Sequence, residues 1–400
     1  MSENIGFMNI RRLALISIFV FASTAMLAQG PLTSIPIEMY GDHIFIKLKV
    51  NNSRDLDFIF DTGDGLTVLN IQTARELSME RGSESTTASA EGTISGKLLK
   101  HQKIEINNIE ITNLKIYETS LLHLERSIGR NIDGIIGYDI LQNYVVELNF
   151  SEMTLNLHSS MSSVTNRGKE FPINLTSYIP HLSGSATLSN GDKISGEFFI
   201  DTGAKTTVDF NTHFVDSKGL IDKVGDSYIY LVSGLGDKEY EHHRGRVTQF
   251  SVGSFAFDNV PVGLSRSPSG IQNHKKVAGI IGSGILRKFD LVFDYKNKKM
   301  YWGKSKNFGA AFPVNASGLE LQLDKTKSKV LVHKVFEGGA GQNAGIKLDD
   351  EIISVNGKTA SEMGLAELRK AFSQDGAQVK LVISRGGATQ NVDLTLKSMI

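Results

Sequence analysis

The stretch FIFDTGDGLTVLN, from Phe58 to Asn70, decides the fold because the chain repeats it. The second copy, FFIDTGAKTTVDF, runs from Phe198 to Phe210. A lone Asp-Thr-Gly is a weak signal, since Asp and Gly are common turn residues. Here, however, an apolar segment precedes both copies of the tripeptide and Thr-Val follows both. Repetition of the whole context indicates more than an ordinary turn.

The repeat extends on both sides of these stretches. Upstream, IPIEM at residues 35–39 is echoed by FPINL at residues 171–175. Downstream, the stretch that begins at Asn131 aligns without a gap with the one that begins at Lys276, and both contain Gly-Ile-Ile-Gly. The segments between these anchors alternate or are β-branched, which predicts strands, with at most short helices after each Thr-Val.

The sequence therefore predicts two β-rich lobes and one further domain. We expect the first lobe at residues 32–158 and the second at residues 171–305. The Ser-rich stretch at 159–170 is the expected linker between them. Composition shifts after Trp302, so we expect a different domain at residues 314–400.

Each lobe supplies one acid, Asp61 or Asp201, directly after a predicted strand. Equivalent loops of two similar lobes can meet at a pseudo-twofold axis, which would bring the two carboxylates together. We therefore favour a catalytic placement of these acids over two coincidental turns.

These paired blocks resemble the aspartic protease superfamily, and its retroviral-type (retropepsin-like) branch more than the pepsins. The matching residues are the two Asp-Thr-Gly triplets, the later Ile-Ile-Gly elements at 135–137 and 280–282, and Ala204 with Thr207-Val208 after the second acid. Unlike the retroviral enzymes, which dimerise, this chain holds both halves. The resemblance covers about residues 35 to 305.

The resemblance implies a mostly β fold, with two pseudo-symmetric acid-protease β-barrel lobes. It implies an aspartic-type endopeptidase, a hydrolase whose catalytic residues are Asp61 and Asp201. The active-site support would come from neighbouring residues of both motifs, namely Thr62, Gly63, Thr202 and Gly203. The threonines would bond across the lobe interface, and the glycines would permit a sharp bend beside the carboxylates.

Two adjacent carboxylates suit peptide hydrolysis because both do not readily ionise together and they share one proton. The ionised acid would activate a water, and the protonated acid would polarise the scissile carbonyl. The sequence does not assign the proton to Asp61 or to Asp201.

Two further features of the lobes concern the cleft. Glycine-containing hairpins at Thr87–Gly96 and Leu231–Tyr240 stand where the family carries its flap. Asp64 replaces the small residue that the second copy has at Ala204. Its side chain would either face the catalytic pair or cap a local backbone amide, and the sequence leaves both orientations open.

The C-terminal region resembles a small α+β PDZ-like domain of the kind attached to bacterial exported proteases. The matching elements are Ala344-Gly345, Asp349–Ile353 and Val355–Gly357, with a helix expected over Glu367–Phe372. Such domains add an extended peptide to a sheet edge. The expected peptide-binding loop comprises Gly318, Leu319, Glu320 and Leu321; Glu320 departs from the family pattern and adds a negative charge there.

Composition excludes several other functions. Lys plus Arg equals Asp plus Glu at 43 each, so a nucleic-acid-binding surface has no support. The chain has no cysteine, which excludes disulfides, thiol nucleophiles and cysteine-ligated metals. The histidines His242 and His243 would point apart on a strand. We therefore expect neither a metal nor a cofactor.

The N-terminus carries Arg11-Arg12 before the uncharged apolar run Leu13–Ala28. The run is shorter than the ~20 residues of a membrane-spanning helix, so we interpret residues 1–28 as a signal peptide. A signal anchor or a buried first helix is the alternative. We expect export to the periplasm or the extracellular space, with no stable membrane anchor after cleavage.

The sequence thus predicts an exported aspartic endopeptidase that acts on a peptide or protein substrate. The PDZ-like module would recruit substrate or regulate cleavage, with a peptide as its own ligand. The alternative is a catalytically inactive peptide-binding or adaptor protein on the same fold.

Overall fold

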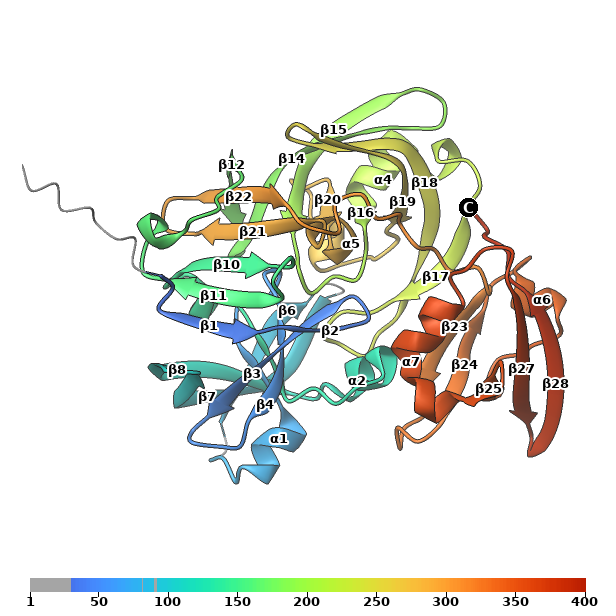
Figure 1. Cartoon of the computed structure of the whole chain (residues 1–400), viewed down its shortest axis with the longest axis horizontal. Coiled ribbons are helices and arrows are strands. Elements are labelled where there is room, and N and C mark those ends of the chain that lie inside the picture. The colour runs from blue at the N-terminus through green and yellow to red at the C-terminus, as the bar shows by residue number, and fades with distance from the viewer. Residues whose placement is uncertain (1–29, 81, 90–91) are drawn as a thin grey trace, which may run out of the picture.

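The computed structural model describes residues 30–80, 82–89 and 92–400. The predicted signal peptide, residues 1–28, lies outside the described residues. Strands dominate: two eight-stranded sheets form two lobes, a six-stranded sheet joins them, and a second six-stranded sheet forms a C-terminal domain (Figure 1). The mostly β prediction is confirmed.

The first lobe is built on one eight-stranded sheet with short helices at its margin. Its strands, in spatial order, are β2 (Glu38–Tyr40), β3 (His43–Val50), β4 (Leu56–Phe60), β9 (Gly134–Ile136), β5 (Val68–Asn70), β8 (Ile109–Thr119), β7 (Gly92–Ile106) and β6 (Ser83–Ser89). The helices are α1 (Ile71–Glu76), α2 (Leu122–Ile128) and α3 (Tyr138–Leu141).

The second lobe repeats this strand order. Its sheet runs β13 (Asn174–Thr176), β14 (Ile179–Thr187), β15 (Lys193–Ile200), β20 (Gly279–Ile281), β16 (Val208–Phe210), β19 (Phe255–Leu264), β18 (Tyr240–Val252) and β17 (Tyr228–Val232). Its helices are α4 (Thr212–Lys218) and α5 (Ser283–Leu286), with 3-10 turns η2 (Ile221–Lys223) and η3 (Ile271–Asn273). The equivalence of β4 with β15 and of β9 with β20 confirms the internal repeat.

A six-stranded sheet joins the two lobes. Its order is β1 (Thr33–Pro36), β11 (Thr154–His158), β10 (Val145–Asn149), β21 (Phe289–Asp294), β22 (Lys299–Lys304) and β12 (Lys169–Pro172), with the 3-10 turn η1 (Met161–Ser163) nearby. The two lobes meet at its centre, where β10 pairs antiparallel with β21 and Leu148 lies opposite Leu291.

One hydrophobic core runs through both lobes and this joining sheet. On one face of strand β4, Phe58 and Phe60 are fully buried. In the second lobe Phe198 packs edge-on against Phe250, with ring centroids 5.2 Å apart. Burial of each such side chain contributes about 1.5–3 kcal/mol to the stability of the folded state. The acid-bearing loops therefore rest on a rigid support.

The C-terminal domain has its own core. Its sheet runs β23 (Leu319–Leu323), β24 (Val330–Val335), β25 (Glu351–Val355), β27 (Gln378–Arg385) and β28 (Ala388–Thr395), with β26 (Lys358–Thr359) beside β25 and helices α6 (Ala340–Asn343) and α7 (Ala360–Ala371). Helix α7 begins earlier than predicted because Thr359 and Glu362 form a capping box.

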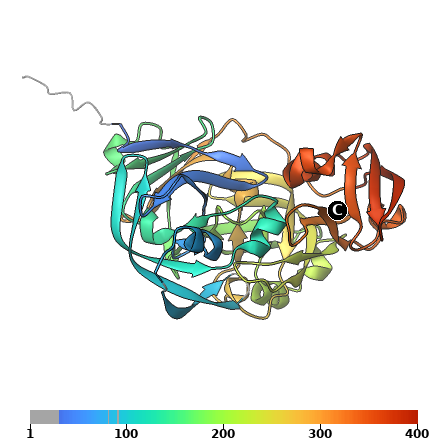
Figure 2. The ribbon, with the colours of Figure 1, turned by 90° about the horizontal axis from the view of Figure 1, so that it is seen from below.

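Figures 1 and 2 place this domain at one end of the molecule. There α7 lies next to α2 of the first lobe, and β17 of the second lobe approaches the same domain (Figure 1). Among the described residues, no helix combines the length and the apolar character that crossing a bilayer requires.

Candidate active site

Asp61 and Asp201 occupy equivalent positions at the ends of β4 and β15. The backbone N–H of Asp61 donates to Ile136 O at 3.1 Å, and that of Asp201 donates to Ile281 O at 3.1 Å. These acceptors belong to the two Ile-Ile-Gly elements, β9 and β20, which pair in parallel with the acid-bearing strands. The repeat therefore places each acid on the same kind of support.

Thr62 and Thr202 join the two loops through reciprocal hydrogen bonds. The Thr62 hydroxyl donates to Ile200 O at 2.8 Å and accepts from Thr202 N at 3.1 Å. The Thr202 hydroxyl donates to Phe60 O at 3.1 Å and accepts from Thr62 N at 3.0 Å. Both threonines are buried, at 1% and 0% exposed, so the four bonds are shielded from water.

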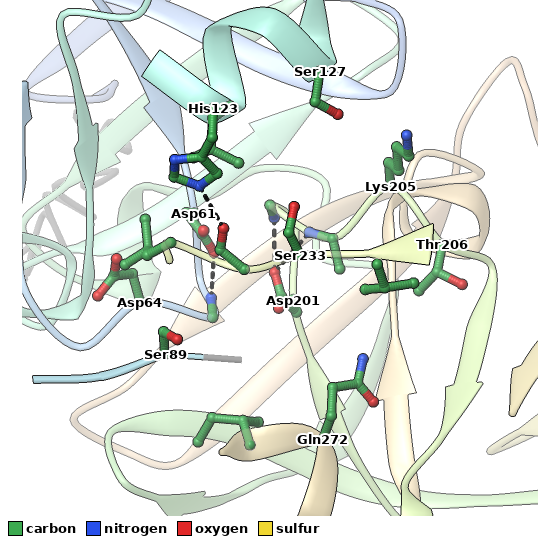
Figure 3. Close-up of a pocket in the computed structure, with 18 of the residues that line it drawn as sticks. Asp61, Asp64, Ser89, His123, Ser127, Asp201, Lys205, Thr206, Ser233 and Gln272 are labelled. Atoms are coloured by element: carbon green, nitrogen blue, oxygen red, sulfur yellow. Dashed lines mark hydrogen bonds between the residues drawn. The ribbon is translucent and has the colours of Figure 1, made fainter. Parts of the chain in front are cut away.

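The glycines of the two motifs bring the carboxylates together. A Cβ on Gly63 would fall 2.3 Å from Asp201 Cγ, and a Cβ on Gly203 would fall 2.2 Å from Asp61 Oδ2. No larger residue fits at either place while the opposite acid keeps its position. Each lobe thus supplies one acid and leaves room for the acid of the other lobe (Figure 3).

The environments of the two carboxylates differ. Asp61 Oδ1 accepts a hydrogen bond from Gly63 N at 2.7 Å. Asp201 Oδ1 accepts two, from Gly203 N and from Ala204 N, both at 2.9 Å. Burial raises the pKa of both acids, and the pKa of Asp61 is raised well above its usual range by burial and by the neighbouring charges of Asp201 and Asp64. The geometry therefore favours the proton on Asp61 and the negative charge on Asp201.

Asp64 caps a local backbone amide, which is one of the two orientations that the sequence left open. Its Oδ1 accepts a hydrogen bond from Leu66 N at 3.2 Å, as a turn-capping residue would. Its Oδ2 is buried with no hydrogen-bond partner among the described residues, and the residue lines the same cavity as Asp61. Burial raises the pKa of Asp64 to about 7. A third acid therefore acts on the electrostatics of the pair.

A cavity of about 770 Å³ extends from the acid pair between the lobes. Thr87 and Ser89 of the β6–β7 hairpin and residues 231–235 of the β17–β18 hairpin line it, so both expected flap segments lie at the cleft. Residues 90–91 of the first hairpin lie outside the described part of the chain. A cleft of this size, with buried acids at its floor, can hold an extended peptide.

The predicted peptide-binding loop lies partly in this cavity. Leu319 and Leu321 are buried in the C-terminal domain, while Glu320 and Leu321 also line the cavity. The strand that carries them, β23, lies at the edge of its sheet. Two carbonyls of this strand already accept hydrogen bonds: Leu321 O from Arg369 at 2.7 Å and Leu323 O from Arg126 at 2.9 Å. Peptide binding at this loop stays a prediction.

Lys205 and Arg244 are among the cations that line the cavity and were not predicted as site residues from the sequence. The repeat offered a signal for the first, because Lys205 stands where the first copy has Gly65. No comparable signal existed for Arg244, which reaches the cavity from the middle of a long strand, β18.

Family models match two parts of the chain. Residues 46–140 match the aspartyl protease model, which covers the Asp61 loop and β9. Residues 311–384 match the PDZ domain model. The chain therefore carries an aspartyl protease domain and a PDZ domain. The suspected combination of a retropepsin-like protease with a C-terminal PDZ domain is confirmed.

Curated bacterial proteins match a smaller share of the chain. The carboxy-terminal processing protease CtpA of Bacillus subtilis (strain 168) is 30% identical over 124 residues, which are 31% of this chain and 26% of the relative. A probable CtpA-like serine protease of Staphylococcus saprophyticus is 28% identical over 116 residues, 28% of this chain and 22% of the relative. A similarly named protein of Staphylococcus aureus is 24% identical over 125 residues, 31% and 24% respectively. The chain spans about a quarter of the length of these relatives.

These relatives correct the expected enzyme type. Two of them are named serine proteases, which contradicts the expectation of an aspartic-type endopeptidase. The expected aspartic-type label is therefore contradicted by the names of these relatives, whose matches cover 28–31% of this chain.

Proposed function

We propose that the cleft between the lobes binds an extended peptide and hydrolyses one of its peptide bonds, with a water held between Asp61 and Asp201. The observation that carries this proposal is the reciprocal fit of each motif glycine against the opposite acid. Such packing supports a close approach of the two half-buried carboxylates, which could then share one proton.

The roles follow from the hydrogen bonds. Asp201, with two backbone donors, takes a proton from the water, whose oxygen attacks the scissile carbonyl carbon. Asp61 gives its proton to the carbonyl oxygen, which yields a tetrahedral diol. When the diol collapses, the proton on Asp201 passes to the departing amine nitrogen and a hydroxyl proton returns to Asp61. The pair ends as it began, and no bond forms between protein and substrate.

The four bonds between Thr62 and Thr202 support this scheme. They hold both loops to the same point, which keeps the carboxylates in position without a cost in ordering during the reaction. The PDZ domain would serve substrate binding or regulation, since Glu320 and Leu321 line the same cavity as the acids. Peptide addition beside Gly318 and Leu319 is a further part of this proposal.

A serine-reactive probe tests the reaction type. The protein is incubated with an unbiased peptide mixture, with or without prior treatment with a fluorophosphonate, and the products are identified by mass spectrometry. We expect cleavage that the fluorophosphonate leaves unchanged. Loss of cleavage together with labelling of one serine would replace the acid pair by a serine nucleophile. Binding of peptides without any cleavage would favour the peptide-binding alternative.

Export is also part of the proposal. The apolar run before Ala28 supports it. Sequencing the N-terminus of the protein purified from a bacterial periplasm or culture medium tests it, and a mature protein that still begins at Met1 would contradict it.

A further inference from the structure

The PDZ domain closes one end of the cleft. Glu320, Leu321 and Gln322 of β23 and His333 of β24 line the cavity that contains the acid pair. The cavity is therefore lined by residues of both lobes and of the PDZ domain, which lies at one end of the molecule (Figure 1).

Contacts to the second lobe hold this wall in place. His333 Nε2 lies 2.8 Å from Glu239 Oε1, and Lys334 Nζ lies 3.2 Å from Glu241 Oε1. The ring of Tyr228 lies against that of Phe336, with centroids 4.8 Å apart. These contacts fix the β17–β18 hairpin, the second expected flap, to the PDZ domain.

Contacts to the first lobe complete the closure. Lys327 forms an ion pair of 2.9 Å with the buried Glu125 of α2. Arg126 of α2 donates to Leu323 O, and Arg369 of α7 donates to Ser127 O at 2.6 Å. The PDZ domain therefore spans both lobes, and a peptide that lies along the cleft meets it.

Two cations at this end of the cleft form no ion pair with any acid of the described residues, although the charge of Glu320 acts on both. The side chain of Lys205 forms no hydrogen bond or ion pair within the described part of the chain. The guanidinium of Arg244 likewise forms none there, and lies over the ring of Tyr230 at 4.3 Å from its centroid. Figure 3 shows Lys205 pointing away from Asp201.

The neighbouring charges have other partners. Asp42 pairs with Arg287 at 2.5 Å, and Asp209 accepts from the Thr206 hydroxyl at 2.5 Å. Glu320 Oε2 accepts from Leu231 N at 3.4 Å. The other cations in the vicinity, Arg126 and Arg369, are bound to the carbonyls described above. Lys205 and Arg244 therefore remain available to an anion that enters the cleft.

The lowered pKa of Lys205 also bears on anion binding in the cleft. The side chain of Lys205 is in contact with the solvent in the cavity, yet the surrounding protein lowers the pKa of Lys205 to about 8, chiefly by desolvation and then by the charge of Arg369. Because the Lys205 side chain is exposed, an anion can reach it from the cleft and accept a charge-assisted hydrogen bond.

We propose that Lys205 and Arg244 form a subsite for a carboxylate of the bound peptide, at the end of the cleft that the PDZ domain closes. The proposal rests on the proposed function, in that the cleft must bind a peptide. A carboxylate fits because both cations can donate hydrogen bonds to its two oxygens. Its source is either the C-terminus of the peptide or an acidic side chain.

The position of the subsite limits where cleavage falls. Lys205 follows Asp201 by four residues, and four residues span at most about 14 Å. A peptide whose scissile bond lies on the acid pair would therefore place its carboxylate within the next few residues. Recognition of a C-terminal carboxylate would confine cleavage to bonds near the C-terminus.

Equilibrium binding separates this proposal from the proposed function. The full chain with Asp201→Asn, which prevents turnover, is titrated against three N-terminally fluorescein-labelled heptapeptides of Ala and Leu. One ends in a free carboxylate, one ends in an amide, and one is an amide whose last residue is Glu. Fluorescence anisotropy gives each Kd, so the result does not depend on cleavage.

We expect the free carboxylate to bind about tenfold more tightly than the amide. Adding Lys205→Gln or Arg244→Gln should abolish this difference, whereas Lys193→Gln, on the exposed start of β15, should preserve it. Equal affinity of the Glu-amide and the free carboxylate would assign the subsite to acidic side chains, and weaker binding of the Glu-amide would assign it to the C-terminus. Equal and measurable binding of all three peptides, or discrimination that survives both substitutions, would overturn the proposal, whereas undetectable binding of all three would overturn the proposed function on which it rests.

Discussion

Gly63 of the first lobe lies directly against Asp201 of the second, so closely that a Cβ on the glycine would come within 2.3 Å of the carboxyl carbon. The inverse relation holds between Gly203 and Asp61. Each glycine is therefore required by the acid of the other lobe, and not only by the bend of its own loop.

A methyl group at Gly63 should displace Asp201. We expect Gly63→Ala to lower kcat/KM for peptide cleavage by about 100-fold, since a shift near 1 Å in a catalytic group has effects of that size. Gly309→Ala is the matched control, because a Cβ there meets nothing within 4 Å. Full activity of Gly63→Ala would show that the two carboxylates need not meet.

The Thr62 hydroxyl should contribute to stability through two buried partners. Thr62→Val keeps the shape but leaves Thr202 N and Ile200 O without their partner. We expect the free energy of unfolding to fall by about 2–6 kcal/mol, at about 1–3 kcal/mol for each unsatisfied group. Thr62→Ser keeps the hydroxyl, so its free energy of unfolding, measured by urea denaturation, should fall less than that of Thr62→Val. Equal stability of the Val and Ser variants would contradict this reading of the lobe junction.

Asp64 should extend activity towards neutral pH. Its negative charge, which appears as the pH rises through about 7, raises the pKa of Asp61, so the pair keeps its shared proton at higher pH. In Asp64→Ala the pKa of Asp61 falls. The alkaline limb of the pH–kcat/KM profile should therefore move to lower pH in the variant. Superimposable profiles of the parent and the variant would leave Asp64 as a turn residue only.

The contact between the β17–β18 hairpin and the PDZ domain should depend on pH. The hydrogen bond to Glu239 raises the pKa of His333 above 6.5, and the same bond lowers the pKa of Glu239 below 4.5. The contribution of His333 to the stability of this contact is complete below pH 6.5 and is lost as the pH rises through the raised pKa of His333. The contribution of Glu239 to the same stability is complete above pH 4.5 and is lost as the pH falls through the lowered pKa of Glu239.

Hydrogen exchange of β17 and β24, corrected for intrinsic rates, measures this contact. Protection should be greatest between about pH 4.5 and 6.5 and should fall at pH 8. His333→Gln should remove the dependence above pH 6.5. A parent protein whose protection does not change between pH 6 and pH 8 would contradict the assignment.

The two lobes could be predicted from the sequence because the chain contains an internal repeat whose two copies can be compared with each other. Two copies of Asp-Thr-Gly and of Gly-Ile-Ile-Gly, in the same order and at similar spacings, indicate that the same architecture occurs twice. The strand order of the two sheets is accordingly the same. The parallel pairing of β4 with β9, and of β15 with β20, explains why the Ile-Ile-Gly elements recur with the acids.

The docking of the PDZ domain could not be predicted in the same way. Its contacts join residues such as Tyr228 with Phe336 and Arg126 with Leu323, pairs that follow no period and no repeat. The orientation of Asp64 was also beyond sequence reasoning, because its two oxygens lie in different environments. The prediction of the enzyme type was wrong for a different reason. A motif identifies residues more reliably than it identifies the reaction that those residues carry out.

Cleavage by single asparagine variants tests the central claim most directly. Asp61→Asn and Asp201→Asn are each incubated with the peptide mixture that the parent cleaves, alongside Asp222→Asn, an exposed control in η2. The proposed pair predicts that both single variants lose cleavage while the control keeps it, because neither acid can hold the proton and the charge alone. Substantial turnover by either Asp61→Asn or Asp201→Asn, in a protein with an unchanged melting profile, would contradict the account.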